Sequence, residues 1–216
     1  PTAHCWPPHP LTGPSSCGRW QPDLTGHTNL VNCVLFKPDG KHIISASFDM
    51  TARLWDIASG KQLNTLLLPG QGSSVALSAS GTLLAVGCTE GMVALFDVTT
   101  GYTLLTTFSA HLGSSSAWFG LCFSPVCGSL LLATCSRMDS TATVWDLSTA
   151  VVAAAGAEPT PVAVLQGHTK VISDVRLSGD GTLIATASDD NTVRVWDAVT
   201  GQELHKLTDT PTRCTV

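Results

Sequence analysis

The chain has 216 residues, of which 44% are hydrophobic and 12% are charged, so it can bury a sizeable core and is not compositionally disordered. No apolar run approaches the roughly 18 residues that span a bilayer, so no membrane segment is expected. The net charge of −5 and the 11 scattered Lys and Arg residues argue against direct binding to nucleic acid.

The eight cysteines do not predict a disulfide framework. They include no C-x-x-C pair, and a chain of this length does not need disulfides, so reduced, mostly buried thiols are expected. Residues 1–23 lack a secretory signal and form a Pro-rich, irregular lead-in, which favours a cytoplasmic or nuclear protein. The spacing of the His and Cys residues in this segment matches no common zinc pattern, so neither a metal nor another cofactor is expected. These residues are His4, Cys5, His9 and Cys17.

Residues 24–67 predict four short antiparallel strands. Apolar-rich runs end at turn residues such as Pro38-Asp39-Gly40 and Asp49, which is typical of strands joined by tight turns. The expected strands cover 31–36, 43–47, 51–55 and 61–67.

The same pattern then recurs along the chain. Trp55-Asp56 follows Gly26-His27 by 28 residues, and Trp196-Asp197 follows Gly167-His168 by the same distance. A third copy is longer, and a second copy ends at Phe96-Asp97 and lacks the His. A repeat of about 40 residues with four strands is typical of a propeller blade, which buries its faces on its neighbours.

The Gly-His and Trp-Asp pairs at this spacing resemble the WD40 repeat family over about residues 24–208. The resemblance implies an all-β propeller with four four-stranded antiparallel blades. Closed rings of this family usually have about seven blades, so we expect an incomplete arc of a larger propeller. The expected repeats are 24–67, 68–107, 108–164 and 165–208, followed by the start of a further blade or a tail at 209–216.

The resemblance also implies a buried structural tetrad of His, Ser or Thr, Asp and Trp in each regular blade. A Ser-His-Asp hydrolase triad is the alternative interpretation, but no nucleophile elbow or separate oxyanion loop accompanies the set, so no catalytic residue is predicted. The tetrads are His27, Ser45, Asp49 and Trp55; His111, Thr134, Asp139 and Trp145, with Cys135 a rival for the Thr position; and His168, Thr186, Asp190 and Trp196. The second repeat has Leu68, Val86, Glu90 and Phe96 instead, and we expect it to be held by packing alone.

Partner binding is expected at the loops of one propeller face, the top face. The resemblance places exposed residues before the first strand and between the second and third. Apolar Phe48, Phe119 and Met138 at such positions suggest a docking patch, although Phe119 could instead turn inward and fill its blade. The candidate positions are Leu30, Asn32, Phe48, Gln71, Ser73, Thr89, Ala117, Phe119, Met138, Val171, Ser173 and Asp189.

The insertion at 148–161 is rich in small residues and predicts a flexible loop, with a short, poorly capped helix as the alternative. Taken together, the features predict a non-catalytic scaffold or adaptor that binds proteins or peptides within a multiprotein complex. The alternatives are a WD40 subunit of a ribonucleoprotein or ubiquitin-ligase assembly and, less favoured, a propeller enzyme. Ubiquitin-ligase receptors often have an Arg two residues after Trp-Asp, and this chain does not. Its residues there are Ala58, Ser148 and Val199.

Overall fold

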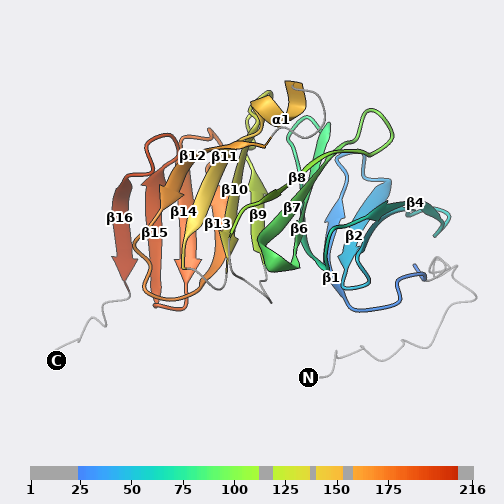
Figure 1. Cartoon of the computed structure of the whole chain (residues 1–216), viewed down its shortest axis with the longest axis horizontal. Coiled ribbons are helices and arrows are strands. Elements are labelled where there is room, and N and C mark those ends of the chain that lie inside the picture. The colour runs from blue at the N-terminus through green and yellow to red at the C-terminus, as the bar shows by residue number, and fades with distance from the viewer. Residues whose placement is uncertain (1–23, 112–118, 137–139, 153–157, 209–216) are drawn as a thin grey trace, which may run out of the picture.

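Four antiparallel four-stranded sheets, arranged side by side, make up the fold (Figure 1). The structure is a computed structural model that describes residues 24–111, 119–136, 140–152 and 158–208. The first two sheets contain β1 (Val31–Phe36), β2 (His42–Ser47), β3 (Thr51–Asp56), β4 (Gln62–Leu67), β5 (Gly72–Leu77), β6 (Leu83–Cys88), β7 (Met92–Asp97) and β8 (Thr103–Ser109). The other two contain β9 (Phe119–Phe123), β10 (Leu131–Ser136), β11 (Ala142–Asp146), β12 (Thr160–Leu165), β13 (Ile172–Leu177), β14 (Leu183–Ser188), β15 (Thr192–Asp197) and β16 (Glu203–Thr208).

Each sheet is a meander, because its strands pair in chain order. The turn chemistry read from the sequence closes the hairpins: Oδ1 of Asp39 accepts the backbone N–H groups of Lys41 and His42 at 2.8 and 3.1 Å. The carboxylate of Asp180 does the same for the N–H of Thr182 at 3.1 Å. Side chains alternate between the two faces of each sheet, and equivalent residues of different blades lie on the same face.

The two faces of a blade have different roles, shown here for the first blade. Its Trp face carries Val34, Ile43 and Trp55, and its rear face carries Ile44, Ala46, Ala52 and Leu54. The rear face packs on Leu84, Val86 and Phe96 of the second blade in one hydrophobic cluster.

The same junction joins the other blades. Val93 and Leu95, on the rear face of the second blade, cluster with Leu121 and Trp145 of the third. The third junction packs the rear face of the third blade on the Trp face of the fourth, through Ala133, Cys135, Ala142, Val144, Ile172, Val175, Ile184 and Trp196. The core therefore lies between blades, and the two inner blades are buried on both faces.

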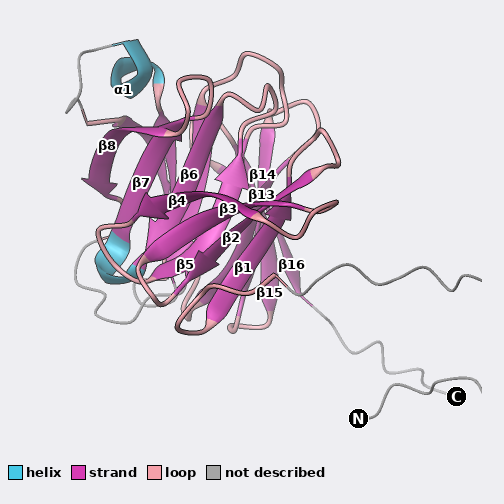
Figure 2. Cartoon of the chain, turned by 90° about the vertical axis from the view of Figure 1, so that its right-hand side faces the viewer, coloured by secondary structure: helices cyan, strands magenta, loops and turns pink. Residues whose placement is uncertain are grey.

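The blades form an open arc, as predicted. Strands β1, β5, β9 and β13 are neighbours in that order along the inside of the arc. The first and last sheets lie at opposite ends of the row in Figure 1, and Figure 2 views the molecule from the side of the first sheet. Among the described residues, one face of each end blade therefore has no neighbouring blade.

The start of the insertion adopts the alternative to the expected flexible loop, because residues 148–152 form the short helix α1 (Ser148–Val152). The Ser148 N–H donates to Oδ1 of Asp146 at 2.8 Å, which caps the helix that the sequence left uncapped. Ala150 is buried in the core cluster beside Leu147. The burial of one small apolar side chain, that of Ala150, therefore determines the conformation of this segment. Among the described residues, no helix is long and apolar enough to cross a membrane.

Candidate functional site

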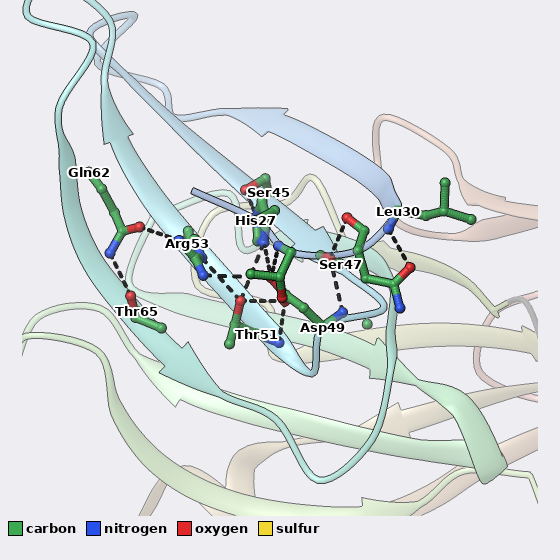
Figure 3. Close-up of polar contacts among 12 residues, drawn as sticks. His27, Leu30, Ser45, Ser47, Asp49, Thr51, Arg53, Gln62 and Thr65 are labelled. Carbon is green, nitrogen blue, oxygen red and sulfur yellow. Dashed lines mark hydrogen bonds and ion pairs between the residues drawn. The ribbon is translucent and has the colours of Figure 1, made fainter. Parts of the chain in front are cut away.

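In the first blade, the four predicted side chains meet in one hydrogen-bonded chain, and Figure 3 labels three of them, His27, Ser45 and Asp49. The Trp55 indole N–H donates to Oγ of Ser45 at 2.8 Å, and this oxygen lies 2.7 Å from Nε2 of His27. The other ring nitrogen, Nδ1, lies 2.8 Å from Oδ2 of Asp49. A carboxylate only accepts, so in the neutral ring Nδ1 carries the proton and Nε2 accepts the Ser45 hydroxyl proton. Each donor in this chain then has an acceptor.

The fourth blade repeats this geometry. The Trp196 indole N–H donates to Oγ1 of Thr186 at 2.8 Å, and Thr186 Oγ1 lies 2.8 Å from Nε2 of His168. His168 Nδ1 lies 2.9 Å from Oδ2 of Asp190. The first and fourth blades therefore contain the same hydrogen-bonded tetrad.

The third blade has a Thr at the central position. The Trp145 indole N–H donates to Oγ1 of Thr134 at 3.0 Å, and this oxygen lies 2.9 Å from Nε2 of His111. Its rival, Cys135, lies instead in the cluster that packs on the fourth blade. Asp139 lies outside the described residues.

The second blade has an apolar cluster where the others have the tetrad. Leu68, Val86 and Phe96 are all buried, whereas Glu90 is exposed in a turn with positive φ. Burial raises the pKa of the nearby Cys88 thiol to about 12, so this side chain stays neutral and packs as a small hydrophobe. Three of the four positions are apolar and the fourth is exposed, so this set leaves no buried donor without a partner.

The structure adds a residue that the sequence reasoning missed. Thr51 donates its hydroxyl to Oδ1 of Asp49 at 2.6 Å, and Thr192 does the same for Asp190 at 2.6 Å. Beside Thr51, the Arg53 Nε–H donates to its hydroxyl at 3.2 Å (Figure 3). A Thr two residues after the turn Asp in both regular repeats was the signal that could have revealed it.

The two turn carboxylates are held in their charged form. Burial by itself raises the pKa of Asp49, but hydrogen bonds from the Thr51 hydroxyl, the His27 ring and the Thr28 N–H outweigh burial, so the pKa lies well below its ordinary value. The equivalent bonds lower the pKa of Asp190 in the same way. Both carboxylates are therefore ionised in the folded chain wherever Asp is ionised in the unfolded chain.

This arrangement predicts a loss of stability in acid. Because the folded pKa of Asp190 is depressed, its contribution is complete above the unfolded pKa, about 3.9, and is lost as the pH falls below that value. Urea unfolding measured from pH 7 to pH 2.5 should show the free energy of unfolding falling below about pH 4. The Asp190→Asn variant should be less stable at pH 7 and show a shallower fall. An unchanged acid slope in this variant would contradict the assignment.

The tetrad of the first blade holds the loop that carries candidate partner-binding residues. Asp49 lies between Phe48 and Met50, and the Phe48 N–H donates to the carbonyl of Leu30 at 2.9 Å. Leu30 is 66% exposed, Met50 is exposed, and Phe48 is half-buried. Three apolar side chains thus come from two loops that backbone hydrogen bonds hold together.

The other candidate partner-binding positions differ in how far they are exposed to solvent. The expectation that Ser73 faces solvent is wrong, because its side chain is buried and donates to the carbonyl of Gly87 at 3.0 Å. Exposed positions are Gln71, Ser173 and Asp189, and half-buried ones are Asn32, Thr89 and Val171. Ala117, Met138 and the side chain of Phe119 lie outside the described residues.

The tetrads do not have the accessibility that a nucleophile needs. Ser45 and Thr186 are buried, and each central oxygen already accepts a Trp N–H. Among the residues that the structure describes, no three His, Cys, Asp or Glu side chains group as a metal site. The candidate metal ligands of the lead-in lie outside the described residues. This geometry is suited to holding loops in place.

Comparison with known proteins agrees with the blade geometry. The family described as WD domain, G-beta repeat matches residues 18–56, 102–146 and 159–197, more than half of the chain. The chain belongs to the WD40 family. The matched segments leave out most of the second blade, the one without a tetrad, although it is a complete four-stranded sheet.

Similar WD40 relatives carry several different names. The chain is 29% identical to nuclear distribution protein PAC1 of Arthroderma otae over 86% of the chain and 39% of that protein. It is 32% identical to a guanine nucleotide-binding protein subunit beta of Nicotiana plumbaginifolia over 79% of the chain and 44% of that protein. A shorter match, 36% identical, covers 44% of the chain and 19% of autophagy-related protein 16 of Arabidopsis thaliana. The chain therefore spans less than half the length of these relatives.

Proposed function

We propose that this WD40 chain is a non-catalytic scaffold that binds proteins or peptides through its blade-end loops, within a multiprotein complex in the cytoplasm or nucleus. The observation that carries the proposal is the apolar group Leu30, Phe48 and Met50 at the end of the first blade. A tetrad fixes the loop that presents two of these side chains, so little conformational entropy is lost when a partner binds them. Exposed apolar side chains on a rigid loop are suited to anchoring a partner.

The surroundings of this group favour a partner with an apolar anchor and polar flanks. The corresponding loop of the neighbouring second blade offers the exposed Gln71 and the half-buried Thr89. A polar rim around an apolar centre is the usual composition of protein interfaces. The net charge of −5 favours proteins over nucleic acids as direct partners.

The double variant Leu30→Ser, Phe48→Ser tests this function. We expect it to lose most captured partners in an affinity pull-down with mass spectrometry, because the apolar anchors are gone. Leu104→Ser is the matched control, since Leu104 is also exposed but lies on the outer strand β8. Circular dichroism should show the same strand signal in all three proteins. An unchanged set of partners with the double variant would argue against this surface.

A variant of Ser45 tests whether the first tetrad is catalytic. Ser45→Ala should lower thermal stability and remove no hydrolytic activity, because the hydroxyl serves Trp55 and His27. Hydrolytic activity that disappears in this variant while the melting temperature stays unchanged would favour the enzyme alternative.

A further inference from the structure

An arginine lies two residues before the Trp of each regular blade and contacts the Gly of the Gly-His pair. In the first blade this is Arg53, and in the fourth it is Arg194. We infer that these two arginines are positioning residues, which hold the Gly-His segment and its tetrad His against the fourth strand of the same blade. This role does not depend on the scaffold function, because it concerns contacts within one blade.

The Gly of each Gly-His pair lies directly on the guanidinium. A Cβ on Gly26 would lie 2.5 Å from Nη1 of Arg53, closer than Cβ atoms approach other atoms in proteins, and 3.2 Å from Trp55. A Cβ on Gly167 would likewise collide with Nη1 of Arg194. The guanidinium therefore occupies the space that a larger residue before the His would need.

Several contacts keep the Arg53 side chain from moving aside. Its Nη1–H donates to Oε1 of Gln62 on β4 at 2.6 Å, and its Nε–H donates to the Thr51 hydroxyl at 3.2 Å. Nη2 lies 3.6 Å from Oδ2 of Asp49. Each nitrogen of the planar guanidinium thus has its own partner, and Arg53 joins the fourth strand to the tetrad (Figure 3).

The arginine of the fourth blade is fixed by burial as well. Arg194 is 7% exposed, and its Nη1–H donates to Oε2 of Glu203 on β16. Its Cζ lies 6.0 Å from the centre of the Trp196 ring, a cation–π distance. Its Nε has no hydrogen-bond partner among the described residues, so Glu203, Trp196 and the backbone of Gly167 hold this side chain. A guanidinium enclosed in this way has little freedom to make room for a Cβ.

The third blade lacks this set as a whole. Ala110 stands before its tetrad His, and Thr143 has the place of the arginine. Pro161 has the place of Gln62, since each pairs with the Trp of its blade. A residue with a Cβ thus precedes the His in the blade that has no arginine behind it.

The second blade also lacks the set. It has Ala94 at the place of the arginine and Leu104 at the place of its strand partner, and it has no Gly-His pair. Glycine and arginine therefore occur together in two blades and are missing together from the other two. An arginine behind a larger residue would clash, and a glycine without the arginine would leave a hole, so the two residues act as one unit.

The arginine and the turn carboxylate hold the tetrad His from its two sides along the chain. The N–H of Thr28, directly after His27, donates to Oδ2 of Asp49 at 3.1 Å, and the N–H of Thr169 does the same for Asp190. The arginine supports the Gly directly before the His. The backbone on both sides of the ring is therefore fixed, which keeps Nδ1 aimed at the carboxylate.

Replacing the arginine by the Thr of the third blade tests this role by hydrogen exchange. In Arg194→Thr, the Thr169 N–H should exchange with deuterium at least tenfold faster, because the Gly-His segment loses its support. The Val195 N–H on β15 should change less than threefold. Equal acceleration at both amides would overturn the role, since the arginine would then stabilise the blade as a whole.

Arg176→Thr is the matched control for this measurement. It makes the same change in the same blade, but Arg176 is exposed on β13 and forms its ion pair with Asp174. We expect it to leave Thr169 exchange within threefold of that of the unchanged chain. An acceleration as large as that in Arg194→Thr would overturn the role, because loss of any arginine charge would then suffice.

A double-variant cycle tests the link between the glycine and the arginine. Gly167→Ala should lower the urea midpoint of the unchanged chain, and it should lower the midpoint of Arg194→Thr less than half as much. The positive φ of Gly167, 157°, makes an Ala equally unfavourable in both backgrounds, so its effect cancels. Equal losses would overturn the inference, because the backbone conformation alone would then require the glycine.

The first blade supplies the same tests if Arg194→Thr does not fold. Arg53 is less buried than Arg194, so Arg53→Thr disturbs the core less. The Thr28 N–H should exchange at least tenfold faster in this variant, and Gly26→Ala should again cost less than half as much beside it. Unchanged Thr28 exchange in folded Arg53→Thr would overturn the role.

Discussion

Replacing Thr186 by Val should lower the free energy of unfolding by about 2 to 4 kcal/mol, because one hydroxyl serves two buried partners. Its oxygen accepts the Trp196 N–H at 2.8 Å and lies 2.8 Å from Nε2 of His168. Val has nearly the shape of Thr but no hydroxyl, so both partners lose their bonds while the packing volume stays the same. Guanidinium unfolding followed by tryptophan fluorescence measures the change.

Thr186→Ser is the matched control for this prediction. It keeps the hydroxyl, as Ser45 does in the first blade, and loses only a methyl group. We expect it to cost less than half of what Thr186→Val costs. Equal losses in the two variants would mean that packing, rather than the hydrogen-bonded chain, makes this position important.

Ile184→Ala should cost about 2 to 5 kcal/mol, since Ile184 is fully buried between the third and fourth blades. Ile43 has the same place in the first blade and is only half-buried, because no described blade packs on it. Ile43→Ala should therefore cost clearly less. Urea unfolding of both variants gives the comparison.

The difference between these two variants isolates the effect of a neighbouring blade. The residue type, the strand and the repeat position are the same, so strand propensity cancels. A larger loss for Ile43→Ala than for Ile184→Ala would show that the end face of the arc is covered in the monomer. The buried cluster around Ile184 would then not be the main source of stability at this junction.

Much of the fold follows from local chemistry that a sequence displays directly. Turn residues such as Asp39 and Asp180 mark the hairpins, the predicted strand 31–36 coincides with β1, and the predicted strand 43–47 lacks only the first residue of β2. The predicted strand 51–55 differs from β3 by one residue. These features are local, because a turn and an alternating strand depend on residues close together in the chain.

Contacts between distant segments decided what local patterns left open. The helix α1 forms because Ala150 packs into the core between the second and third blades, a contact that no local pattern shows. Ser73 is buried in an inner blade, whereas its counterpart Ser173 makes the equivalent hydrogen bond to Ala187 and is exposed in the last described blade.

The sequence by itself determined the repeat, the strands of each blade and the polar residues that could form a tetrad, because spacing and side-chain chemistry are properties of each copy. Only the tertiary structure decided which copies are covered. Val34 and Val175 are the same residue at the same place in their repeats, and one is exposed while the other is buried. The physical reason is that the burial of a blade face depends on the neighbouring blade that packs on it rather than on the blade's own residues.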